Sequence, residues 1–161
     1  MFSLVRIDDR LIHGQVVTMW VRQVNANEIW VVDDTVAADS FTQSVLQMVC
    51  PKEVALSVLS LAGAAEQLAA AQAASTRRLL VLVKRPSVVL KLMDAGLRLT
   101  EVNIGGMGAG PGRKGFYRSV SVSPEDVADL RALTGRGVRV YIQGIPTDPV
   151  FDVGRALANW Q

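Results

Sequence analysis

The only histidine of the chain, His13, lies in the segment RIDDRLIHGQVV at residues 6–17. Two arginines, Arg6 and Arg10, precede it, and a guanidinium group has the fork shape that matches phosphate oxygens. A neutral imidazole can attack phosphorus as a nucleophile, and nearby cations would hold the transferred phosphoryl group. The segment therefore suits phosphoryl transfer. On residue type alone, a histidine beside an apolar pair is more often structural than catalytic, and the helix start and the nearby arginines make the two alternatives equal.

The residues around His13 are typical of a loop that leads into a helix. Gly14 allows close approach to the backbone, and the amides of Gly14 and Gln15 would face an anion at the positive end of the helix dipole. Asp8 and Asp9 would orient the arginines or fix the imidazole tautomer. The candidate catalytic residues are His13 and Arg10, and the candidate phosphate-binding residues are Arg6, Asp9, Gly14 and Gln15.

A glycine-rich segment, GGMGAGPGRKGFYR at residues 105–118, also carries positive charge. Its part at 110–115 matches the pattern G-x-G-x-x-G, but a strand-like run follows it, so no helix is expected to receive a pyrophosphate. Counted from Gly108, it also fails as a Walker A loop, because arginine and glycine stand where glycine and Ser/Thr are required. A solvated flexible loop and a binding loop both remain open. Its candidate phosphate-binding residues are Arg113 and Lys114.

Composition limits the classes of function. The 161-residue chain is 50% hydrophobic and 20% charged, which is ordinary for a compact globular protein. Its length suits one domain over residues 1–161, and no linker-like stretch divides it. The net charge of +2 is too small to indicate a nucleic-acid partner. No apolar run reaches about 18 residues, so we expect no membrane span.

The cysteine and histidine counts argue against a metal. Cys50 is the only cysteine, which excludes an internal disulfide and a cysteine-based metal cluster. Any other metal site would need a cluster of carboxylates, and none has a recognised spacing. We therefore expect no cofactor. The first ten residues, MFSLVRIDDR, lack a cationic region and a long apolar run, so we expect a cytoplasmic location rather than export.

Short apolar runs alternate along the chain with longer amphipathic stretches. The expected strands are residues 2–7, 28–33, 53–59, 78–84, 101–106, 119–123 and 138–144. The expected helices are residues 16–24, 41–49 and 61–74. A fourth helix is expected to start at the SPED segment of residues 123–126 and to carry an apolar stripe over residues 127–133.

This alternation predicts an α/β fold, a three-layer open sheet of about seven mostly parallel strands with helices on both faces. In such folds ligands bind outside the carboxyl ends of the strands. Three loops are expected at that edge, at residues 8–13, 84–87 and 105–118. The first carries His13, and the other two are basic or glycine-rich.

The sequence resembles a known family. RIDDRLIHGQVVTMW is similar to the active-site segment of the IIB components of the mannose/fructose/sorbose family of the bacterial sugar phosphotransferase system. The likeness continues in the same order through IWVVDDTVAADSFTQSVLQMVCP, EVNIGGM, SVSVSPEDV and PTDP, over nearly the whole chain. The resemblance implies that His13 is the phosphorylated histidine and that Arg6 and Arg10 are the active-site arginines.

The resemblance also implies a relay without metal or nucleotide. A IIA phosphohistidine would donate to His13, which would pass the group to a sugar held by membrane IIC and IID partners. The sugar would belong to the mannose, fructose, sorbose or amino-sugar class, and the chain would lie at the inner face of the membrane. The segment GAGPGRKGFY at 108–117 departs from the family pattern, so only Arg113 and Lys114 are carried over from it. Leu11, Ile12 and Met107 are candidates for an apolar docking face, although the first two would equally pack onto the core.

Two other functions compete with a sugar phosphotransferase component. One is a regulatory protein-binding module of the same fold, phosphorylated at His13. Neighbouring genes for IIA, IIC and IID partners would favour the relay over this module. The other is a nucleotide-binding domain that uses the glycine loop, which nucleotide-dependent thermal stabilisation would reveal. Association into a homo-oligomer is left open.

Overall fold

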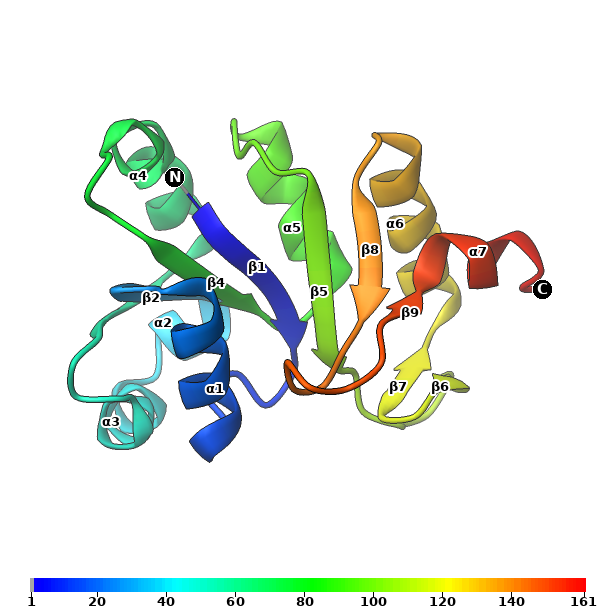
Figure 1. Cartoon of the computed structure of the whole chain (residues 1–161), viewed down its shortest axis with the longest axis horizontal. Coiled ribbons are helices and arrows are strands. Elements are labelled where there is room, and N and C mark those ends of the chain that lie inside the picture. The colour runs from blue at the N-terminus through cyan, green and yellow to red at the C-terminus, as the bar shows by residue number, and fades with distance from the viewer. Residues whose placement is uncertain (1) are drawn as a thin grey trace.

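The computed structural model describes residues 2–161, and strands and helices alternate through them (Figure 1). The strands are β1 (Phe2–Asp8), β2 (Glu28–Val32), β3 (Ala55–Leu59), β4 (Leu79–Val83), β5 (Glu101–Gly106), β6 (Lys114–Tyr117), β7 (Val120–Val122), β8 (Arg139–Ile142) and β9 (Phe151–Asp152). The helices are α1 (Gly14–Val24), α2 (Asp34–Ala37), α3 (Ser40–Val49), α4 (Leu61–Ala73), α5 (Pro86–Asp94), α6 (Pro124–Gly135) and α7 (Val153–Ala158).

Seven strands form one sheet in the order β3-β2-β4-β1-β5-β8-β9. Every pairing in it is parallel except that of β9, which runs antiparallel to β8. The central strand β4, LLVLV, is buried at every position, as expected for a parallel strand covered on both faces. The predicted fold class, a mostly parallel sheet of about seven strands with helices on both faces, is confirmed.

One predicted strand lies outside this sheet. Residues 119–123 contain β7, which pairs with β6 in a separate two-stranded antiparallel ribbon. Its sequence SVSVS alternates apolar and polar residues, a pattern typical of a half-buried antiparallel strand rather than a central parallel one. The seventh strand of the sheet is β9, and its two residues are too few to leave a periodic signal.

The apolar side chains form two clusters, one on each face of the sheet. The larger cluster packs against α4, α5, α6 and α7, and the smaller one packs beneath α1, α2 and α3. Residues of β1 alternate between the faces, with Val5 and Ile7 in the larger cluster and Leu4 in the smaller one. Arg6 and Asp8 therefore share the face of Leu4, on the side of α1.

The carboxyl ends of β1, β5 and β8 point to one edge of the sheet, where the β6–β7 ribbon also lies (Figure 1). The register sets Arg6 opposite Asn103 of β5, and Asn103 opposite Tyr141 of β8. A row of polar residues thus crosses three neighbouring strands just before they end. None of the helices within residues 2–161 is long and apolar enough to cross a membrane.

Candidate functional site

Arg6 lies at the base of the site, with only 1% of its surface exposed. Its Nη1 donates hydrogen bonds to Asn103 Oδ1 and, at 3.1 Å, to the carbonyl oxygen of Gln143. Its Nη2 donates to Asp8 Oδ2 at 3.2 Å and to the carbonyl oxygen of Gly144 at 3.0 Å. Four acceptors from three strand ends therefore surround one buried guanidinium group.

Helix α1 closes this cluster from the solvent side. The Arg6 guanidinium lies 5.1 Å from the centre of the Trp20 ring, which is cation–π distance. The Trp20 indole donates to the carbonyl oxygen of Gly144 at 2.9 Å, so it shares an acceptor with Arg6. Burial lowers the pKa of Arg6 to about 10, even though Asp8 acts in the opposite direction. Arg6 thus stays cationic at neutral pH.

Asp8 joins the two arginines. Its buried carboxylate accepts from Arg6 on Oδ2 and binds the Arg10 guanidinium with both oxygens, through Nε and Nη2, each at 2.9 Å. Oδ1 also accepts the Arg10 backbone N–H at 3.1 Å. Hydrogen bonding to Asp8 raises the pKa of Arg10. The Arg10 side chain is 42% exposed, so its outward edge can meet an anion while its inner edge is fixed.

Glycine at 105 is required by this packing. A Cβ built on Gly105 would overlap the Arg6 guanidinium and lie 2.7 Å from Asp8 Oδ2. At Gly106 a Cβ would lie 3.2 Å from Arg10 Nη2. The two glycines that end β5 therefore leave room for the charged side chains of β1 and its loop.

The loop from β1 to α1 turns sharply to present His13. Leu11 has φ 57° and Gly14 has φ 47°, both in the left-handed region, and the Leu11 N–H bonds to the Asp8 carbonyl at 2.9 Å. Leu11 and Ile12 are buried at 4% and 6% exposure and anchor the loop to the smaller apolar cluster. Left-handed backbone is strained for leucine, and this packing holds it in place.

His13 is the N-cap residue of α1, and its side chain makes no capping hydrogen bond. The residue is exposed, as are Gly14 and Gln15 in the first turn of the helix. Neither ring nitrogen of His13 has a hydrogen-bond partner within residues 2–161. The imidazole thus stands free at the positive end of a helix dipole, three residues after the fixed Arg10.

Asp9 has a different role from Asp8. Its Oδ2 accepts the Gly108 backbone N–H at 2.6 Å, and its own N–H bonds to the Gly106 carbonyl at 3.1 Å. These contacts tie the His13 loop to the segment after β5. Phosphate binding by Asp9 stays a prediction, because in this geometry the carboxylate already serves a backbone amide.

Arg113 and Lys114 have partners of their own. Arg113 donates to the carbonyl oxygens of Gly108 and Ser121 and forms an ion pair of 2.7 Å with Asp126 of α6. Lys114 begins β6, and its Nζ lies 4.9 Å from the centre of the Trp160 ring. Their predicted phosphate-binding roles stay predictions. The segment 105–118 is not an open loop throughout, since it ends in a paired strand.

The proposed docking face of Leu11, Ile12 and Met107 is wrong. All three side chains are buried, Met107 completely, so none presents a surface to a partner. The predicted orienting of the arginines by Asp8 is confirmed, whereas sequence reasoning missed Asn103. Asn103 did carry a signal, since it is the one polar side chain within the otherwise apolar or glycine run VNIGG.

The arrangement suits transfer of a phosphoryl group. It combines an unhindered imidazole, helix amides and an arginine fixed by a buried carboxylate. Within residues 2–161, no group of three or more His, Cys, Asp or Glu side chains is placed to hold a metal ion.

Comparison with known families decides the classification. The family model of the PTS system sorbose subfamily IIB component matches residues 2–160. The chain belongs to this family. It is thus a sugar-specific IIB component of the phosphotransferase system, and the resemblance drawn from RIDDRLIHGQ is confirmed.

Individual relatives agree with this membership. The mannose-specific EIIAB component of Escherichia coli K12 is 36% identical over 147 residues, which are 91% of this chain and 45% of the relative. This IIB component thus spans about half the length of that relative. The N-acetylgalactosamine-specific phosphotransferase enzyme IIB component 2 of the same strain is 34% identical, over 96% of this chain and 97% of the relative.

A solved structure shows the same architecture. The IIBSor domain of the sorbose permease from Klebsiella pneumoniae superposes with a TM-score of 0.94 and is 31% identical. The match covers 100% of this chain and 98% of that domain. Sequence and fold therefore place the chain among the same transferase components.

Proposed function

We propose that this IIB component carries a phosphoryl group on His13. The observation that carries the proposal is the free, exposed imidazole at the start of α1, close in sequence to an arginine that Asp8 holds with two hydrogen bonds. A histidine with a structural role would bury its ring or pair its nitrogens. His13 does neither within the described residues.

The proposed reaction has two balanced steps. In the first, a lone pair of a His13 ring nitrogen attacks the phosphorus of a IIA phosphohistidine. A new N–P bond forms, and the donor's N–P bond breaks and returns its electron pair to the donor imidazole. In the second, a sugar hydroxyl oxygen attacks the phosphorus on His13 and forms an O–P bond. The N–P bond breaks and returns its electron pair to the His13 imidazole, and the hydroxyl proton passes to solvent.

Arg10 and the helix amides support both steps by electrostatics. Charge accumulates on the phosphoryl oxygens, and the outward edge of Arg10 with the first-turn N–H groups of α1 would hold it. The groups are positioned in advance, because Asp8 fixes Arg10 and buried side chains fix the loop. Little rearrangement is then needed as the group arrives.

We propose that residues 1–161 act as one cytoplasmic domain that meets a IIA donor and then membrane IIC and IID partners, as a protein-phosphohistidine–sugar phosphotransferase. The relatives described above are named for three different sugars. The proposed acceptor is therefore a class of sugar, of the mannose, fructose, sorbose or amino-sugar type.

Phosphorylation in a purified system tests the proposal. The chain is incubated with phosphoenolpyruvate, the general phosphotransferase proteins and a matching IIA, and protein mass is followed before and after mild acid. We expect wild type to gain one acid-labile phosphoryl group and His13→Ala to gain none while keeping its circular dichroism spectrum. An equal gain in folded His13→Ala would overturn the proposal.

A further inference from the structure

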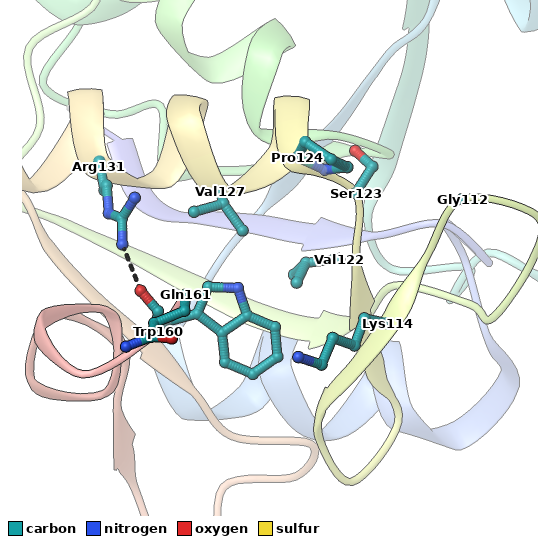
Figure 2. A pocket seen from close by; sticks show the side chains of 9 residues that line it. All are labelled: Gly112, Lys114, Val122, Ser123, Pro124, Val127, Arg131, Trp160 and Gln161. Atoms are coloured by element: carbon teal, nitrogen blue, oxygen red, sulfur yellow. Dashed lines mark hydrogen bonds between the residues drawn. The ribbon is translucent and has the colours of Figure 1, made fainter.

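A cavity of about 330 Å³ lies apart from the His13 loop, among the β6–β7 ribbon, the first turns of α6 and the residues after α7 (Figure 2). Its apolar wall consists of Val122, Pro124 and Val127, and the Trp160 ring faces this wall. The volume is at the lower end of the range for small-molecule sites. The cavity therefore suits a compact ligand with a flat apolar body.

The Trp160 ring contacts a group of other aromatic rings. Its centre lies 5.0 Å from that of Phe116 on β6, and Phe116 meets Phe151 edge-on at 6.1 Å. Tyr117 stacks on Phe151 at 3.9 Å and completes the aromatic group. A wall fixed in this way loses little freedom when a ligand binds.

Two of the side chains that line the cavity are cationic. The lining includes Lys114 and Arg131 but no Asp or Glu side chain. Lys114 Nζ lies over the Trp160 ring and has no carboxylate partner within the described part of the chain. Arg131 uses Nη2 for the carbonyl oxygens of Leu157 and Trp160, at 3.1 and 2.9 Å, and both contacts leave its positive charge unneutralised.

We propose that this cavity binds a small organic anion with a flat apolar body, of the aromatic carboxylate or aryl phosphate type. The ring of the ligand would lie between Trp160 and the valines, and its anionic group would meet Lys114 beside the Trp160 ring, while Arg131 lies on the other side of that ring (Figure 2). The valine and proline wall favours an apolar ring over a ring that carries several hydroxyl groups. None of the residues that line the cavity belongs to the His13 loop.

Titration followed by NMR tests the proposal, with the Trp160 indole N–H as the reporter and Trp160→Phe to assign it. Phenyl phosphate and benzoate are the probes. Benzyl alcohol, inorganic phosphate and glucose 6-phosphate are the controls for charge and for the apolar body. We expect saturable shifts with the two probes at millimolar concentration or below, and affinities at least about tenfold weaker for the controls. No saturable shift with either probe, or equal binding of benzyl alcohol, would overturn the proposal.

Charge variants show whether the anion meets Lys114. Lys114→Met should weaken the binding of phenyl phosphate about tenfold, and Arg131→Met should weaken it less. Arg118→Met is the matched control, because Arg118 belongs to the same ribbon but lies over Tyr117 and does not line the cavity. It should leave the affinity unchanged. Equal losses in the Lys114 and Arg118 variants would mean that only net charge matters, and the assigned site would be wrong.

Discussion

Asp8→Asn removes the charge that the two arginines share while almost preserving the shape of the side chain. Asp8 is 1% exposed and accepts four hydrogen bonds, three from Arg10 and one from Arg6. An asparagine retains one oxygen, and its NH₂ group would face guanidinium donors. The substitution therefore leaves the buried Arg6 without its carboxylate partner.

The loss of stability in Asp8→Asn follows from the burial of Arg6. Breaking a buried ion pair by removing one partner costs about 3–5 kcal/mol. We expect about 3 kcal/mol of unfolding free energy for Asp8→Asn, the lower end, because Arg6 keeps the oxygens of Asn103, Gln143 and Gly144 as acceptors. Arg10→Met removes the more exposed partner of the same carboxylate and should cost about 1 kcal/mol or less.

Urea unfolding followed by circular dichroism measures both variants. The double variant Asp8→Asn/Arg10→Met completes a double-mutant cycle. Its loss of unfolding free energy should be smaller than the sum of the losses in the two single variants, because both substitutions break the same contact. Loss of Asp8 should also slow phosphorylation, since Arg10 is no longer fixed. If Asp8→Asn lost no more unfolding free energy than Arg10→Met, the view that the buried Arg6–Asp8 pair organises the site would be refuted.

Three further predictions concern other contacts. Gly105→Ala should cost at least about 2 kcal/mol in urea unfolding, because its Cβ would overlap buried charged groups, whereas Gly115→Ala, with nothing within 4 Å, should change stability by less than about 0.5 kcal/mol. Arg10→Gln should slow phosphoryl uptake at least about tenfold; a change under about threefold, less than 1 kcal/mol in the barrier, would remove Arg10 from the mechanism. Burial raises the pKa of Glu28, but hydrogen bonds from Arg77 and an indole outweigh it, and the net pKa is below 4.5. This stabilisation is present above pH 4.5 and is lost as the pH falls through the lowered pKa. In Arg77→Met, the free energy of unfolding, measured by urea unfolding at several pH values, should therefore fall less steeply as the pH drops below 4.5.

The local features of the site could be predicted from the sequence. The helix start after His13, the buried strand at β4 and the capped start of α6 all follow from short-range patterns, and the structure has each of them. The order of the residues in RIDDRLIHGQ also places both arginines in or beside one strand. These signals are local because they depend on side-chain periodicity and capping within a few residues.

The long-range contacts could not be predicted in this way. Arg6 and Asn103 are 97 positions apart, and only the order of the strands in the sheet brings them together. The choice between Asp8 and Asp9 also depends on the strand register, since one carboxylate points to Arg6 and its neighbour turns to Gly108. The contact of Lys114 with Trp160 has no local signature either, because it joins β6 to a residue 46 positions further along the chain.

The central claim, that His13 carries the phosphoryl group at the start of α1, is tested most directly by NMR of the phosphorylated chain. Phosphorus resonances show which side chain is modified, and amide and guanidinium resonances show which groups sense it. The account predicts a single phosphoramidate signal coupled to the imidazole of His13, with shifts at the Gly14 and Gln15 amides and at the Arg10 Nε–H. A phosphoryl group on any other residue would contradict it.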